Sequence, residues 1–202
     1  MTGIGIIVGV LVGLALIIIG YFISTQRSLV NLDEMCKNAL SQIEVQLNSR
    51  WDALLGLAQT AAQYAKHESE TLEGVITARA NATKVTIDPT NMTPEDLKKY
   101  QEAQGEVTSA LSRLIAVSEA YPDLKANQNF LELQNQLEGT ENRITVERNK
   151  FNEVAREYNT QRRTFPTNIL AAIFNFGEKP YFQAQEGADK APKVDFGTSE
   201  GK

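Results

Sequence analysis

Apolar residues recur every three or four positions over three long stretches of the chain, which is the spacing that lines one face of an α-helix. The first stretch, from Ser28 to Thr83, contains no proline and is predicted to be one continuous helix. The second is predicted from Pro94 to about Tyr121, and the third from about Asn127 to Thr164. A short apolar segment, Ile169 to Phe176, follows Pro166.

The break before the second helix has the signature of a helix start. Thr93 can cap the helix, Pro94 suits its first position, and Glu95 and Asp96 place negative charge in its first turn. Pro122 is expected to end this helix.

A different pattern occupies the N-terminal part of the chain. Ile4 to Ile23 is an uncharged, mostly apolar run of 20 residues, which is the length needed to cross a hydrocarbon core of about 30 Å. The alternative is a cleaved signal peptide, but no basic residue precedes the run and no A-x-A site follows it. We expect a retained anchor. Because Arg27 and Lys37 follow the run, the positive-inside rule predicts a single-pass protein of the cell membrane, with its N-terminus outside and its bulk in the cytoplasm.

Gly5, Gly9 and Gly13 lie four residues apart and therefore share one stripe of the predicted membrane helix. Small residues at this spacing allow two helix backbones to approach closely in lipid. Glycine is also frequent in membrane helices for other reasons. We favour a contact between helices, and with one span per chain the partner is expected to be a second copy.

Composition narrows the range of chemistry. The net charge of −5, from 20 basic and 25 acidic residues, offers no electrostatic footprint for nucleic acid. One cysteine, Cys36, and one histidine, His67, are too few for a zinc site of the usual type. The sequence has no phosphate-binding loop and no G-x-S-x-G or H-E-x-x-H motif. We therefore predict no enzyme activity, no catalytic residues, and no cofactor or metal.

Four blocks of sequence resemble the LemA family, in the family's order. They are ALSQIEVQLNSRWDALLGL, YAKHESETLEGVITARA, LQNQLEGTENRITVERNKFNEVAREYN and FPTNILAAIFNF. The resemblance implies one N-terminal span, an antiparallel cytoplasmic bundle of long helices, and no established enzymatic activity. One departure is Leu55-Gly56, where the family pattern would have a Pro-Asn pair. The expected fold is all-α, with a membrane helix that continues into a bundle of three to four helices.

We expect a transmembrane anchor at residues 1–24, a bundle at 25–182 and a disordered tail at 183–202. With one continuous first helix, the shorter second and third helices would cover only its distal half. The stretch near the membrane would then expose an apolar stripe, which normally marks an interface. The predicted self-association stripe is Leu29, Leu32, Leu40, Ile43, Leu47 and Trp51. In the alternative geometry, the first helix bends near Gly56 and the bundle doubles into a shorter four-helix form.

The same geometry places the last apolar segment at the distal end, far from the membrane. Its residues are Ile169, Leu170, Ile173, Phe174 and Phe176. They either cap the open end of the bundle, which we favour, or contact a neighbouring subunit, a partner or a second bilayer.

Several polar residues have a functional and a structural interpretation. We expect His67 to be a polar position on the long helix rather than a pH switch or base. Phe151 and Tyr158 are expected in the core, and Asn152 and Asn159 in polar bonds between helices rather than in a ligand site. Glu141 and Arg148 share a face and could meet Glu44 and Arg50 in a buried ion network, but solvated flanks are the favoured interpretation.

The predicted function is a membrane-anchored, self-assembling scaffold that organises or shapes membrane. The alternative is a membrane-tethered adaptor that binds an unidentified cytoplasmic protein in signalling or envelope stress. The expected partners are further copies of the chain and the lipid around the anchor.

Overall fold

The computed structural model describes residues 2–183, and these residues form helices and connections with no strand. The helices are α1 (Thr2–Tyr64), α2 (Ser69–Lys84), α3 (Pro94–Ala120), α4 (Pro122–Lys125), α5 (Gln128–Arg163) and α6 (Thr167–Ile173). The all-α prediction is confirmed. The predicted tail, apart from Gln183, lies outside the described residues.

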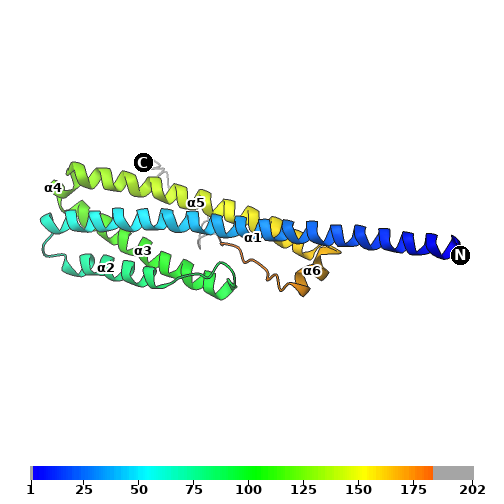
Figure 1. Ribbon diagram of the computed structural model, residues 1–202. Helices are drawn as coiled ribbons and strands as arrows, with labels where there is room; N and C mark the ends of the chain where they lie inside the picture. Colours follow the sequence, from blue (N-terminus) through cyan, green and yellow to red (C-terminus); the bar gives the residue numbers. More distant parts are fainter. Residues whose placement is uncertain (1, 184–202) are drawn as a thin grey trace, which may run out of the picture.

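Helix α1 is continuous from the apolar run into the bundle, and its N-terminal part extends well beyond the other helices (Figure 1). The large apolar side chains between Ile4 and Ile23 are all exposed. Burial begins at Thr25 and is complete at Leu29. Within the described residues, α1 is the one helix long and apolar enough to span a membrane.

The predicted continuous helix from Ser28 to Thr83 is wrong, because the chain turns at residues 65–68. Glu68 N donates to Ala65 O at 3.0 Å in this turn, and α2 starts at Ser69. His67 therefore lies in a turn and not on a helix. The predicted bend at Gly56 does not occur either, and a Cβ at Gly56 would stand 3.1 Å from Leu133 Cδ1 of α5. Gly56 thus serves a close helix contact within an unbroken α1.

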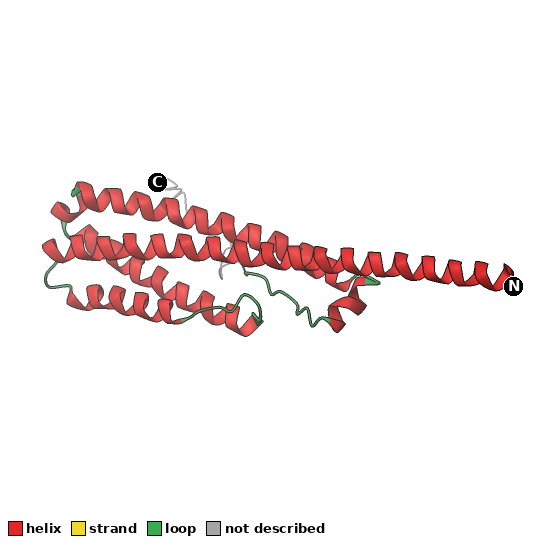
Figure 2. Ribbon diagram, in the orientation of Figure 1, coloured by secondary structure: helices red, strands yellow, loops and turns green. Residues whose placement is uncertain are grey.

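Because the chain turns at residues 65–68, each helix after this turn runs in the opposite direction to the one predicted. Helix α2 runs back toward the end from which the apolar run extends, α3 runs away from that end, and α5 returns alongside α1 (Figures 1 and 2). The closest packed pairs are α1 with α5 and α2 with α3. The bundle is therefore the shorter four-helix form, although its turn lies nine residues beyond Gly56 or later.

The limits of α3 and α5 agree with the sequence patterns. Asp96 N donates to Thr93 Oγ1 at 3.1 Å, and Thr93 N donates to Asp96 Oδ2 at 3.2 Å. This reciprocal capping box fixes the start of α3. Asn127 caps α5 by accepting from Phe130 N at 3.0 Å.

The apolar stripe of α1 next to the apolar run is covered by the chain's own α5, so the prediction that it is uncovered is wrong. Leu29, Leu32, Leu40, Ile43 and Leu47 are all buried, and Trp51 is half-buried against the core. The residues of α5 that pack in the same cluster are Ile144, Phe151, Ala155 and Tyr158. Phe151 and Tyr158 are core residues, as expected. A second cluster fills the distal half between α1, α2, α3 and α5.

Candidate functional site

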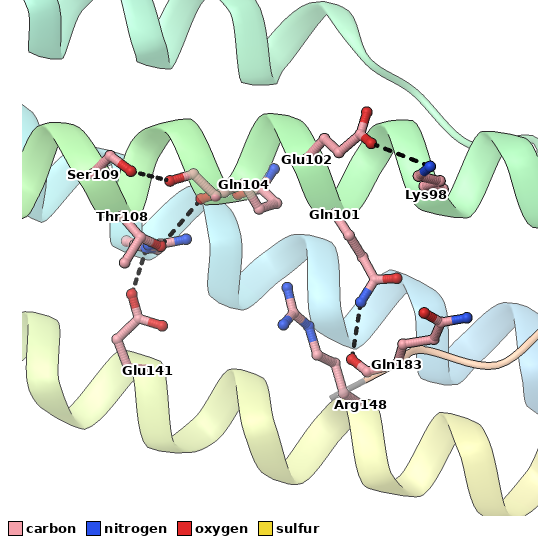
Figure 3. A pocket seen from close by; sticks show the side chains of 11 residues that line it. Lys98, Gln101, Glu102, Gln104, Thr108, Ser109, Glu141, Arg148 and Gln183 are labelled. Carbon is pink, nitrogen blue, oxygen red and sulfur yellow. Dashed lines mark hydrogen bonds and ion pairs between the residues drawn. The ribbon is translucent and has the colours of Figure 1, made fainter. Parts of the chain in front are cut away.

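A polar pocket opens on the side of the bundle between α1, α3 and α5 (Figure 3). Its volume is about 570 Å³. Arg50 contributes from α1, Gln104 and Thr108 from α3, and Glu141 and Arg148 from α5. These side chains come together because α5 returns along α1, which the sequence patterns did not predict.

Arg50 is the most buried charged group of the pocket, with 2% of its surface exposed. Its Nε lies 2.6 Å from Glu141 Oε1, and its Nη2 donates to Thr108 Oγ1 at 2.7 Å. The favoured interpretation of solvated flanks is therefore wrong here, and Glu141 forms a partly buried ion pair. Burial lowers the pKa of Arg50, and although the Glu141 charge acts in the opposite sense, the net shift is downward.

Two other groups give the pocket unused hydrogen-bonding capacity. Gln104 is 2% exposed, and neither its Nε2 nor its Oε1 has a hydrogen-bond partner among the described residues. The guanidinium of Arg148 stacks over the Phe182 ring at 5.4 Å, and burial lowers its pKa. The lining also includes Lys98 and Glu102, so three cationic side chains face two carboxylates, a balance that suits the binding of an anionic or polar group.

The last described residues, 176–183, form an extended strap that runs along α5. Asn159 Nδ2 donates to Lys179 O at 2.7 Å, and Lys179 N donates to Asn159 Oδ1 at 2.9 Å. Asn152 holds Phe182 in the same two-bond manner, at 2.9 and 2.8 Å. The prediction that these asparagines bond between helices is wrong. Their spacing of seven residues positions two amides along one face of α5, where they satisfy the backbone of the strap.

The strap is also fixed to α1 by a buried lysine. Lys179 Nζ lies 2.7 Å from Asp33 Oδ1 and donates to Pro89 O at 2.8 Å. Burial acts to raise the pKa of Asp33, but hydrogen bonds and charge from Lys179 and Lys37 outweigh it and hold the pKa below its ordinary value. This tie joins the end of the described chain to the α1 helix.

No other part of the described chain contacts the predicted self-association glycines. A Cβ at Gly5, Gly9 or Gly13 would meet no atom within 4 Å. This geometry leaves the stripe open to another helix.

The last apolar segment does not lie at the distal end, so that prediction is wrong. It follows α5 to the end of the bundle from which the apolar part of α1 extends (Figure 1). Leu170 is buried and Phe176 is half-buried against the core. Ile169, Ile173 and Phe174 are exposed.

Comparison with known proteins identifies the family to which this chain belongs. The model of the LemA family matches residues 39–196, which is most of the chain. The chain belongs to the LemA family. The LemA match starts within α1, well after the apolar run, and includes α2 to α6 and the strap.

Two kinds of relative are similar to this chain. Protein LemA of Metamycoplasma hominis is 27% identical over 179 residues, which cover 89% of this chain and 76% of that protein. Magnetosome protein MamQ 2 of Paramagnetospirillum magneticum is 34% identical over 87 residues, 43% of this chain and 32% of that protein. Magnetosome protein MamQ of Magnetospirillum gryphiswaldense is 32% identical over a stretch of the same length. The similarity to the MamQ proteins thus spans about a third of their length.

Proposed function

We propose that this LemA-family protein is a membrane-anchored scaffold that assembles with itself and has no catalytic activity. The observation that carries the proposal is the continuity of α1 from Thr2 to Tyr64. Because the same helix forms the apolar run and the spine of the bundle, contact between two spans would fix two bundles beside one another. Such rigid coupling is what a scaffold in a membrane requires.

The glycine stripe is the surface that we assign to this contact. The leucine stripe of α1 packs inside the chain's own bundle and is not available to a second copy. Gly5, Gly9 and Gly13 remain open, and close backbone approach over small residues is the main source of helix packing in lipid.

Gly9→Leu tests the proposal, because a large side chain in the middle of the stripe would keep two backbones apart. Ala15→Leu is the matched control, since it adds the same side chain about a third of a turn away from the stripe. The mass of the complex in native-like lipid should fall for Gly9→Leu and stay unchanged for Ala15→Leu. Equal masses for wild type and both variants would contradict self-assembly through the glycines.

The orientation that we propose places the bundle in the cytoplasm. Arg27 and Lys37 follow the apolar run, and no basic residue precedes it in this sequence. A C-terminal alkaline phosphatase fusion is expected to be inactive, whereas a fluorescent-protein fusion is expected to be bright. The reverse pattern would contradict this orientation.

A membrane-tethered adaptor is the second candidate, and the polar pocket is the observation that favours it. Arg148 and the unpartnered Gln104 amide could receive an acidic or polar side chain of a cytoplasmic protein. A wild-type chain that is monomeric in lipid would favour the adaptor over the scaffold.

A further inference from the structure

The end of the bundle that faces the apolar run is formed by an elbow, residues 163–176, which consists of the last residue of α5, the three residues that connect it to α6, α6 itself and the three residues after it. The elbow concentrates exposed apolar side chains as no other part of the described bundle does. Its exposed fractions are 76% for Phe165, 47% for Ile169, 66% for Ile173 and 53% for Phe174. Elsewhere in the bundle, exposed large apolar side chains are scattered singly.

Helix α6 is two-sided at this position. Leu170 and Ala171 are buried and attach the helix to the bundle. Ile169 and Ile173 lie four residues apart, so they share the opposite, exposed side. Figure 1 shows α6 running across the direction of α1 rather than along it. The elbow therefore presents a row of apolar side chains outward at the end of the bundle.

Two hydrogen bonds determine which part of α1 lies beside the elbow. Ser28 Oγ donates to Gln161 Oε1 at 3.1 Å, so these residues lie at one level. Because α5 runs toward the apolar part of α1, Arg163 lies about 3 Å closer to it than Gln161 does. Arg162 Nε donates to Phe176 O at 2.7 Å, which returns the far end of the elbow to the same level. The elbow thus lies beside the segment of α1 between Ile23 and Ser28.

That segment is where the membrane surface is expected. The uncharged run ends at Ile23, and at 1.5 Å per residue it matches a hydrocarbon core of about 30 Å. Tyr21 and Phe22 are exposed near its end, in the position that aromatic residues occupy at a membrane interface. Arg27 is the first charged residue after the run. The exposed side chains of the elbow are therefore level with the lipid headgroups.

The charges around the elbow suit a lipid surface. Arg27 and Arg163 are both exposed at this level. Arg162 is half-buried, and its Nη1 lies 3.8 Å from the nearest acidic group there, Glu178 Oε2. The next acidic residues on α1, Asp33 and Glu34, lie about 9 Å or more further from the run than Arg27. Arginines beside an apolar row are the arrangement by which interfacial segments bind anionic lipid.

We propose that the elbow binds the surface of the same membrane that α1 spans. Phe165, Ile169, Ile173 and Phe174 insert into the interfacial layer, and Arg27 and Arg163 contact lipid phosphates. The chain is then attached to the bilayer at two points, the span and the elbow, and the bundle cannot rotate freely relative to the membrane. This inference depends on membrane anchoring through α1 and does not depend on self-assembly.

The test measures how deeply single tryptophans lie in the bilayer. The full chain with Trp51→Phe carries one added tryptophan, either by Phe165→Trp or by Val146→Trp. Val146 lies on α5 and is 51% exposed. It is about 26 Å further from the proposed membrane surface than Arg163, the last residue of that helix. Each variant is reconstituted in vesicles of phosphatidylcholine and phosphatidylglycerol, with or without phosphatidylcholine brominated near the headgroup. Circular dichroism of each variant confirms the helical fold.

Bromine should remove most of the emission from the indole at position 165 and leave the emission from position 146 almost unchanged. Replacing the phosphatidylglycerol by phosphatidylcholine should reduce the loss at position 165, because fewer phosphates remain to attract the arginines. Equal, weak quenching at both positions would overturn the proposal. So would quenching at position 165 that disappears when the protein is diluted in lipid, since that result would assign the elbow to a contact between copies of the chain.

Discussion

At the scale of single residues, the bundle removes one guanidinium almost completely from water. Arg50 has 3% of its side chain exposed, whereas its partner Glu141 keeps 37%. The two ends of the pair therefore have unequal access to hydration. A charge left without its partner is costly only when water cannot replace that partner.

This asymmetry predicts the order of two substitutions. Glu141→Gln leaves a buried cation without its counter-charge and should lower the free energy of unfolding by about 2–3 kcal/mol. Arg50→Met leaves a carboxylate on a side chain that is 37% exposed and can turn toward water, and should cost at most ~1 kcal/mol. Chemical unfolding of both variants in detergent measures the difference. A larger loss for Arg50→Met would contradict the burial described for the pair.

Sequence patterns named Arg50, Glu141 and Arg148 of this site, with a buried ion network between them as the less favoured alternative, but did not identify Gln104 or Thr108. The period of seven placed Phe151 and Tyr158 in the core correctly, because burial follows from the helical spacing alone. The same spacing on one helix cannot tell whether Glu141 faces water or Arg50. The environment of Glu141 depends on which helix α5 packs against, and the turns between helices determine which helices pair.

At the scale of elements, the helices were easier to predict than the connections. Helix α3 starts at a threonine cap followed by proline, and these signals act locally. The turn at 65–68 contains neither proline nor glycine, so no local signal in the sequence predicts it. The strap has no alternating pattern because side-chain amides of α5, and not a neighbouring strand, satisfy its backbone.

The strap should respond to acid through Asp33. Because the pKa of Asp33 is held below its ordinary value in the folded state, its ion pair with Lys179 adds stability above the unfolded pKa of about 4. That contribution is lost as the pH falls through the folded-state pKa. Asp33→Asn should therefore lower the thermal midpoint at pH 7, and the gap from wild type should narrow between about pH 5 and pH 3.

The control for this experiment is Asp52→Asn, which changes an exposed carboxylate on the same helix. The thermal midpoint of Asp52→Asn should stay close to that of the wild type over the whole pH range. Thermal unfolding followed by circular dichroism provides both curves. A gap between wild type and Asp33→Asn that stays constant with pH would contradict the assigned role of the ion pair.

At the scale of the whole molecule, one missed turn accounts for two wrong placements, that of the leucine stripe as uncovered and that of the last apolar segment at the distal end. With a single helix to Thr83, α5 would run outward and leave the leucine stripe uncovered. With the turn at 65–68, α5 runs back toward the apolar run of α1, covers the stripe and brings α6 beside the end of that run. The predicted helices were mostly right, but those that follow the turn run in the opposite direction to the prediction.

The central claim is therefore that α5 returns along α1 to the end of the bundle from which the apolar run extends. The most direct test introduces cysteines by Ser28→Cys and Gln161→Cys, with Cys36→Ala, into the full chain in lipid. A short bis-maleimide should join these positions within one chain, as mass spectrometry of the cross-linked peptides would show. The control pair Lys66→Cys and Gln161→Cys should not be joined, because Lys66 lies in the distal turn. Cross-linking of the control pair without cross-linking of positions 28 and 161 would contradict the account.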